Sequence, residues 1–159
     1  MAVKKVVTFG HPALRSQSKN IDNFNDIRVL IDDMFDTMYE FDGIGLAAIQ
    51  IGIPKRIIVM DICKEENKKE PRYFVNPVIK NKDILKSTYE EGCLSVPNQF
   101  AEVDRPKKCD IEYLDYNGEK KILKAEGLLA ICIQHEMDHL EGILFIDYLS
   151  KLKKSMIIK

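Results

Sequence analysis

Residues 126–142 carry the feature that most constrains how this chain can fold. The segment reads EGLLAICIQHEMDHLEG, and an apolar run of this length that ends at Gly142 predicts a helix. His135 and His139 are four residues apart, so a helix stacks both imidazoles on one face, with Cβ atoms about 6 Å apart. Three side chains that favour burial share this face: Leu128, Ile131 and Cys132.

The two histidines predict a metal site inside the protein. A solvated helix face with chance histidines is the alternative, but the apolar neighbours turn this face inward. Two buried imidazoles without partners would cost free energy, whereas a metal ion binds both as ligands. Glu136 is rotated by about 100° from His135 on the helix. Its carboxylate is therefore expected beside the open coordination position of the ion, where a proton acceptor belongs.

A third metal ligand has to come from elsewhere in the chain. Some zinc enzymes with this spacing use a histidine six residues after the second one, but that position is Phe145 here. Others use a glutamate further downstream, and only Glu141 stands between His139 and the last residue. The remaining candidates are one histidine and the four cysteines: His11, Cys63, Cys93, Cys109 and Cys132.

Cys93 is the candidate that its sequence setting favours. It lies in the segment EGCLSVP, in which glycine lets the backbone approach another group closely and proline closes the segment. Cys132 shares the helix face, but it is seven residues from His139, about 10.5 Å along the axis, too far for one ion. A cysteine packed at a strand end is the alternative for Cys93.

The rest of the chain predicts one long helix followed by strands. Apolar residues in 25–41 recur at three- and four-residue spacing, with Asp22 or Asn25 as the cap and Gly43 as the stop. Residues 56–125 consist of short β-branched runs separated by turn signals. This order predicts an α+β fold, in which antiparallel sheets pack around a central helix that carries the histidines.

Local composition predicts the structure of the loops and of the tail. The polar stretch at 64–72 predicts an exposed loop between two strands. Asn117-Gly118 lies between two alternating runs and predicts a hairpin with a tight primed turn. A last helical segment is expected from about residue 147 into the tail. We expect residues 1–159 to form a single catalytic domain.

Composition limits the partners and the compartment. The chain has 24 basic and 25 acidic residues and a net charge of −1, which gives no electrostatic reason for nucleic-acid or membrane binding. The first residues lack the core of a signal peptide, and no apolar run reaches membrane-spanning length. Its cysteines lack the paired spacing of a secreted disulfide scaffold. We therefore expect a cytoplasmic protein.

Three motifs resemble those of the peptide deformylase family, in the family's order and spacing. GIGLAAIQ at 43–50 resembles its glycine-and-glutamine motif, EGCLS at 91–95 its cysteine motif, and QHEMDHLEG at 134–142 its metal helix. PALR at 12–15 and LFID at 144–147 resemble flanking segments. The resemblance extends to about Leu149, and the three motifs together are far more specific than the histidine motif alone.

The resemblance implies an enzyme that removes the formyl group from the N-formylmethionine end of newly made proteins and releases formate. It implies that Cys93, His135 and His139 bind the metal, with Fe²⁺ as the usual ion and Zn²⁺ or Ni²⁺ as substitutes. A metal-activated water attacks the formyl carbon, and Glu136 takes its proton and passes it to the leaving amine.

Further site residues come with the resemblance. Gln50, through its side chain, and Leu94, through its backbone N–H, are expected to stabilise the oxyanion. A buried amide that serves backbone groups is the alternative for Gln50. The substrate pocket is expected to be lined by Ile44, Gly45, Glu91, Leu128, Ile131 and Cys132, with ordinary core packing as the alternative.

Two positions set this chain apart from the family pattern. Phe100 stands where many members carry an arginine that contacts the substrate backbone, so peptide anchoring beyond methionine is expected to differ. The tail SKLKKSMIIK is short for a segment that docks on the ribosome in the family, and a solvated helix end is the alternative.

Two other functions share some of these residues. A zinc peptidase would use both histidines and Glu136, but it needs a conventional third ligand. A structural zinc domain would close the site with another cysteine, and Glu136 would have no role. Neither reading accounts for the segment that contains Gln50.

Overall fold

The structure is a computed structural model, which describes residues 2–63 and 65–158. These residues form two antiparallel sheets, three α-helices and three short 3-10 helices, labelled η. The α+β class and the antiparallel sheets expected from the sequence are therefore confirmed. In chain order the elements are η1 (Pro12–Arg15), α1 (Ile27–Glu40), β1 (Gly45–Ala47), η2 (Ala48–Ile51), β2 (Ile57–Met60), β3 (Arg72–Lys80), β4 (Lys86–Cys93), β5 (Val96–Pro106), β6 (Lys108–Leu114), β7 (Lys120–Glu126), α2 (Gly127–Leu140), η3 (Phe145–Tyr148) and α3 (Lys151–Ile158).

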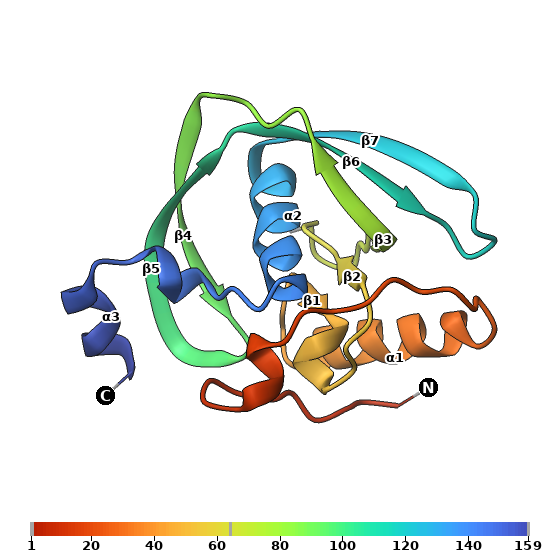
Figure 1. The fold of residues 1–159 in the computed structure, drawn as a ribbon, viewed down its shortest axis with the longest axis horizontal. Coiled ribbons are helices and arrows are strands. Elements are labelled where there is room, and N and C mark those ends of the chain that lie inside the picture. The colour runs from red at the N-terminus through yellow and green to blue at the C-terminus, as the bar shows by residue number, and fades with distance from the viewer. Residues whose placement is uncertain (1, 64, 159) are drawn as a thin grey trace.

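Five strands form the larger sheet, in the order β1-β2-β3-β6-β7, and every neighbouring pair is antiparallel. Among the described residues, β4 and β5 pair only with each other and form a separate long hairpin. Figure 1 shows this hairpin on one side of α2, with the larger sheet on the other side. The extended region predicted for 56–125 is thus divided between two sheets.

Strand β2 shows how the larger sheet joins two helices into layers. All four of its residues are buried, although side chains alternate between the two faces of a strand. Ile57 and Val59 pack in the same apolar cluster as α1, whereas Ile58 and Met60 pack in the cluster that contains α2. Helix α1 therefore covers one face of the sheet and α2 covers the other.

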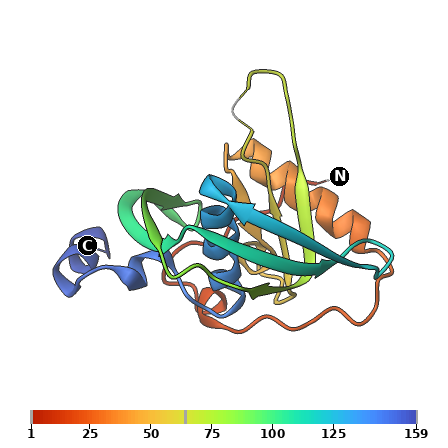
Figure 2. The same cartoon turned by 90° about the horizontal axis from the view of Figure 1, so that it is seen from above.

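Helix α2 lies at the centre of the molecule (Figures 1 and 2). Its buried residues come from every side of the helix and include both histidines and Glu136. A helix that is covered all round does not need a single apolar stripe. The polar residues of α2 therefore lie in the interior, where their partners have to come from neighbouring elements.

Gly142 ends α2, as its position in the sequence predicts. It adopts a left-handed φ of 76°, and its N–H donates to the carbonyl of His139. The N–H of Ile143 reaches back to the carbonyl of Asp138. These two bonds form a Schellman motif, which satisfies carbonyls that the end of a helix would leave without donors.

Both ends of α1 differ from the prediction. Asp26 occupies the N-cap position with a left-handed φ of 63° and makes no side-chain bond to the helix, so the prediction of Asp22 or Asn25 is wrong. The N–H of Ile27, the first helical residue, donates instead to the Phe24 carbonyl at 3.4 Å. At the other end Asp42, not Gly43, adopts the left-handed conformation, with φ 57°. Aspartate tolerates this conformation better than most residues.

The hairpin of β6 and β7 is present, but its turn is longer than the predicted primed turn. Asp115 N–H donates to the Glu119 carbonyl at 3.0 Å, and only Gly118 of the loop has a positive φ, of 78°. The Asp115 carboxylate accepts the N–H groups of Asn117 and Glu119. These bonds stabilise a three-residue loop, in which Asn117 does not need a left-handed backbone.

Residues after α2 form two short helical segments instead of one helix from residue 147. Phe145 and Ile146 of η3 are buried against Val96 and Val103 of β5. Helix α3 is mostly exposed and extends away from one end of the molecule (Figure 2). The packing of η3, together with Ile157 of α3 against the same cluster, therefore attaches the tail to the protein.

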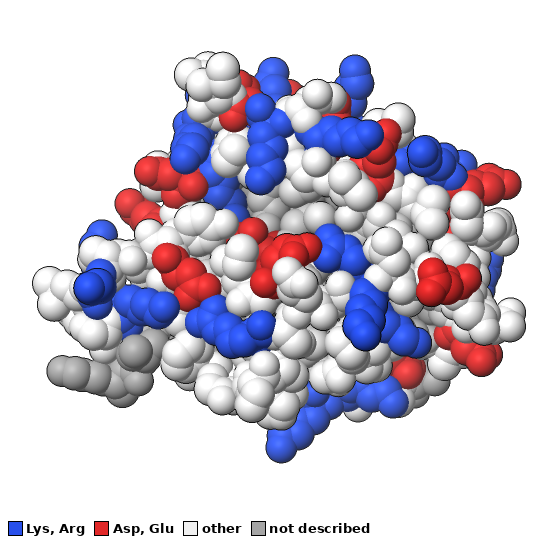
Figure 3. Space-filling view, in the orientation of Figure 1, with Lys and Arg blue, Asp and Glu red and all other residues white. Residues whose placement is uncertain are grey.

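The surface carries charges of both signs. On the face shown in Figure 3, basic and acidic side chains are interspersed, as the small net charge leads one to expect. The loop expected at 64–72 joins β2 to β3 and is exposed over 65–71, while position 64 lies outside the described residues. Within the described ranges, every helix is too short or too polar to span a bilayer.

Gly142→Ala is expected to destabilise the fold more than Gly118→Ala. The two glycines have φ values of 76° and 78°, and a left-handed backbone costs another residue about 1–2 kcal/mol. A Cβ on Gly142 would also lie 2.6 Å from the Arg15 carbonyl oxygen, whereas one on Gly118 would meet only the Phe24 ring at 3.8 Å. Urea unfolding of both variants measures the difference. An equal loss of unfolding free energy in the two variants would mean that the Arg15 backbone moves away from the new Cβ without a cost in stability.

Candidate metal centre and catalytic pocket

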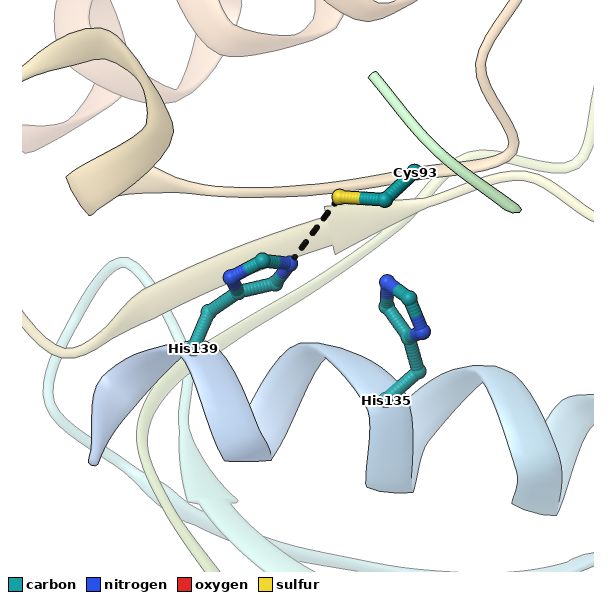
Figure 4. Close-up of side chains that lie close together, drawn as sticks. All are labelled: Cys93, His135 and His139. Carbon is teal, nitrogen blue, oxygen red and sulfur yellow. Dashed lines mark hydrogen bonds between the residues drawn. The ribbon is translucent and has the colours of Figure 1, made fainter. Parts of the chain in front are cut away.

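Helix α2 and strand β4 bring the three predicted metal ligands together. His135 and His139 project from adjacent turns of α2 toward Cys93, the last residue of β4 (Figure 4). Their ligand atoms lie within 4.8 Å of one another, and Cys93 Sγ is 3.4 Å from His139 Nε2. Both histidines are buried and the cysteine is half-buried.

An irregularity in the β4–β5 hairpin directs Cys93 toward the helix. Gly92 pairs with Phe100, yet the next residue, Cys93, pairs with Val96, so residues 97–99 have no partner on β4. Asn98 within this bulge has a left-handed φ of 62°. Bulges bend and twist a strand, and they commonly redirect a side chain beside an active site.

These side chains fit a divalent metal ion. Imidazole nitrogen and thiolate sulfur bind zinc with bonds of about 2.0–2.3 Å, which places tetrahedral ligands roughly 3.5 Å apart. Cys93 and His139 already have this spacing, and the widest pair has to close by about 1 Å. Three protein ligands leave a fourth position open, which is the arrangement of catalytic and not of structural sites.

Glu91 fixes the orientation of His135. Its Oε1 lies 2.9 Å from His135 Nδ1, which leaves Nε2 available to bind a metal ion. Arg105 holds the same carboxylate through Nε and Nη2, at 2.7 and 3.0 Å, and all three side chains are buried. Glu91 also borders the pocket, as expected, but its carboxylate is engaged by these two partners. No local sequence signal marks Arg105.

Negative charges around the imidazoles favour a cation. Burial opposes a charged His135, but Glu136, Cys93 and Glu91 together raise its pKa well above the usual value. Burial, aided by the charges of His135 and Arg105, lowers the pKa of His139 well below its usual value, so this ring is neutral and offers a lone pair. The charges that favour an imidazolium here favour a bound divalent ion in the same way.

Glu136 lies beside the ligands but does not belong to their cluster. Its Oε2 is 3.9 Å from His135 Nε2, and its buried Oε1 has no hydrogen-bond partner among the described residues. Buried carboxylate oxygens normally accept a hydrogen bond. Oε1 is therefore available to a donor on a bound water or substrate. Burial raises the pKa of Glu136 to about 7, against the attraction of a charged His135. A carboxyl group with this pKa can take and return a proton near neutrality.

Gln50 reaches the site from η2. Its Nε2 donates to Cys93 Sγ at 3.4 Å and to Ser95 Oγ at 3.1 Å, and its Oε1 accepts the Ala47 N–H at 2.9 Å. One end of the amide thus serves the backbone, as the alternative reading held, while the other faces the ligand sulfur. Leu94 follows Cys93 in the turn between β4 and β5, and it borders the cavity described next.

A cavity of about 780 Å³ lies beside Cys93 and Glu136. It is bordered by all six residues expected to line the substrate pocket, namely Ile44, Gly45, Glu91, Leu128, Ile131 and Cys132. Phe41, Tyr89 and Phe100 also border it, and of these only Phe100 stood out in the sequence. The wall is therefore largely apolar, which suits a methionine side chain.

The other candidate ligands lie away from the cluster. His11 caps η1, where its Nδ1 accepts the Ala13 N–H at 3.1 Å. Cys109 is buried in the apolar core between the sheet and α2, and Cys63 follows β2. Cys132 borders the cavity, but burial raises the pKa of its thiol well above the usual value, so it remains neutral. All four cysteines are free of disulfides.

A cysteine and two histidines beside a buried carboxylate, at the wall of an apolar cavity, define the class of metal-dependent amide hydrolases. The model of the polypeptide deformylase family matches residues 3–155, nearly the whole chain. The chain belongs to the polypeptide deformylase family. The resemblance seen in its three motifs is thereby confirmed, and the activity is metal-dependent deformylation of protein N-termini.

Relatives and solved structures agree with this assignment. A peptide deformylase of Pelagibacter ubique is 71% identical over 100% of this chain and 93% of the relative, and one of Phenylobacterium zucineum is 54% identical over 100% and 95%. The crystal structure of peptide deformylase from Ehrlichia chaffeensis in complex with actinonin has 43% identity and a TM-score of 0.94, over 99% of this chain and 95% of that one. The peptidase and structural-zinc readings are not favoured.

Gly45→Ala is expected to reduce deformylation by about a hundredfold. A Cβ there would lie 2.5 Å from Glu136 Oε2, so the carboxylate has to move by about 1 Å, and misplacement on this scale costs about 10² in rate. Gly43→Ala is the control, because its Cβ would mainly meet the end of the Leu94 side chain at 2.8 Å, which can rotate away. Formate release at saturating peptide measures both variants. A similar loss in the two would contradict the role given to Glu136.

Proposed function

We propose that this chain deformylates nascent N-formylmethionyl polypeptides with one divalent ion held by Cys93, His135 and His139. The observation that carries the proposal is the convergence of the three ligand atoms, within 4.8 Å, beside the buried carboxylate of Glu136. When bound, the ion supplies Lewis acidity, which makes water acidic near neutral pH and polarises the formyl oxygen. The protein supplies the geometry and the movement of the proton.

In this proposal Glu136 moves the proton. It accepts a proton from the attacking water and delivers it to the amine nitrogen as the C–N bond breaks. The formyl carbon keeps the hydroxyl group and leaves as formate, and the peptide keeps a free amine. Such transfers are worth about 10²–10⁴ in rate. Burial of Glu136 favours the proton-bearing form, and a cation nearby favours the charged form, so the group is poised between them.

Gln50 and Leu94 are proposed to stabilise the charge on the formyl oxygen. Gln50 Nε2 already points at the cysteine sulfur, 3.4 Å away, and the backbone N–H of Leu94 comes directly after the same cysteine. One donor of this kind is typically worth about 10²–10³ in rate. Two donors from different elements would fix the oxygen in one position.

Selectivity for a formyl group is proposed to come from limited space at the metal. The backbone at Gly45 is so close to Glu136 that a Cβ would lie 2.5 Å from its Oε2. A formyl hydrogen fits in such a space, whereas the extra carbon of a larger acyl group would clash. The methionine side chain would occupy the apolar wall formed by Ile44, Leu128 and Ile131. Actinonin is proposed to bind in the same cavity.

Phe100 is proposed to alter how the peptide is held beyond methionine. It is 64% exposed at the border of the cavity, where many family members carry an arginine. An aromatic ring offers contact area but no charged donor to the peptide backbone.

We also propose that residues 1–159 act as one catalytic domain in the cytoplasm. The lysines of α3 are proposed to bind the ribosome.

Fe²⁺ is the proposed resident ion, with Zn²⁺ or Ni²⁺ as substitutes. We expect the iron-loaded enzyme to lose most of its activity in air, because ferrous iron is oxidised and the half-buried Cys93 thiolate is open to oxidation. The nickel-loaded enzyme is expected to keep its activity. Formate release after matched aerobic and anaerobic incubation measures this difference. Equal durability of the two forms would contradict the proposal for iron.

The assay that tests the function is formate release from a formyl-methionyl tripeptide by anaerobically prepared, iron-loaded protein. We expect turnover by the wild type and a loss of about 10²–10⁴ in Glu136→Ala, since that variant lacks the proton acceptor. The unformylated tripeptide is expected to remain intact. Its cleavage would favour a zinc peptidase, and absence of formate from metal-replete protein would overturn the proposal.

A further inference from the structure

The proposed metal ligands come from two separate parts of the fold. Cys93 belongs to the β4–β5 hairpin, whereas His135 and His139 belong to α2. The hairpin shares no strand pairing with the larger sheet in the described part of the chain. The distance from the sulfur to the imidazoles therefore depends on the side chains that hold the hairpin against α2.

A buried ion-pair network makes that connection. Arg105, on β5, binds Glu91 of β4 through Nε and Nη2 and binds Asp138 of α2 through Nη1, at 2.9 Å. Its side chain is only 4% exposed. A guanidinium fork that bonds two carboxylates at fixed angles holds them more rigidly than a point charge would. Glu91 extends the network to His135 Nδ1, 2.9 Å away.

Tyr148 of η3 is the last member of this network, on the side that faces solvent. Its hydroxyl donates to Asp138 Oδ2 at 2.7 Å, the same oxygen that Arg105 binds. The Arg105 guanidinium carbon lies 4.8 Å from the centre of the Tyr148 ring. The ring thus lies over an ion pair that water would otherwise reach, and charge pairs weaken when water surrounds them.

We propose that Tyr148 is a positioning residue for the metal centre and that it governs how long the ion is retained. It acts through Asp138 and Arg105, which fix the hairpin against α2 and keep Glu91 on His135. The segment after α2 therefore takes part in metal retention, although it supplies no ligand. The inference rests on the proposed site at Cys93, His135 and His139.

The chain contains a matched control for this residue. Tyr39 at the end of α1 donates its hydroxyl to Asp61 Oδ2, also at 2.7 Å, and Lys69 Nζ lies 4.2 Å from the centre of its ring. It therefore repeats the tyrosine–aspartate bond with a cation over the ring. Neither Asp61 nor Lys69 belongs to the metal cluster. Tyr39→Phe removes the same kind of bond without touching the proposed metal site.

The experiment measures release of Zn²⁺ into an excess of a chromophoric chelator from zinc-loaded wild type, Tyr148→Phe, Tyr148→Ala and Tyr39→Phe. Loss of groups that support a metal ligand typically costs about 10–100-fold in metal affinity. We expect Tyr148→Ala to release zinc about tenfold faster or more, and Tyr148→Phe to lie between it and the wild type. Tyr39→Phe is expected to release zinc at the wild-type rate.

Thermal unfolding of the zinc-free proteins separates positioning from general stability. The two tyrosine-to-phenylalanine variants are expected to lose similar stability, because each loses one hydrogen bond to an aspartate, while only Tyr148→Phe accelerates release. Wild-type release from Tyr148→Ala, or equal acceleration by Tyr39→Phe, would overturn the inference but not the site. Failure of the wild type to hold one zinc ion through Cys93, tested with Cys93→Ala, would overturn both.

Discussion

Arg105 carries a guanidinium that is buried between strand β5 and helix α2, and the geometry of the site depends on how this charge is paired. Burying an ion costs several kcal/mol unless charged partners and hydrogen bonds compensate for the lost water. The compensation comes from Glu91 on β4 and Asp138 on α2, which belong to different layers. Glu91 lies on the same hairpin as Arg105, so it is the bond to Asp138 that requires the hairpin to lie against the helix, and that position also brings Cys93 to the histidines.

The central helix is unusual in having polar residues in a nearly closed interior, and most of them have specific partners. Gln134 donates to the carbonyls of Pro106 and Ala130, and His135 is held by Glu91. Among the described residues, the buried atoms of α2 without a partner are Glu136 Oε1 and His139 Nδ1. Buried polar groups are rarely left unpaired without a reason. On this helix both belong to the site, and Glu136 Oε1 is where the proposed chemistry needs an acceptor.

Expectations that rest on a clear helical repeat or element order were met, whereas two that rest on the choice of one local hydrogen-bonding group were not. The paired histidines, the helix stop at Gly142 and the α+β class depend on residues within a few positions of one another, and all three are present. The turn at Asn117 was wrong because the Asp115 carboxylate accepts two N–H groups and stabilises a longer loop, and the cap of α1 was wrong because Asp26 takes that position with a left-handed backbone. Local spacing alone does not rank such competitors.

The sequence by itself determined that two imidazoles and a carboxylate share one buried helix, because the helical repeat places residues four apart on one face. Its motifs also identified the family. The tertiary structure decided how Cys93, the candidate that the sequence favoured, reaches the histidines, because a bulge at 97–99 and the docking of the hairpin direct it toward them. It alone revealed Arg105 and Tyr148, whose partners lie up to 33 positions away. Contacts at that separation are set by how layers pack, and no local pattern in the chain encodes them.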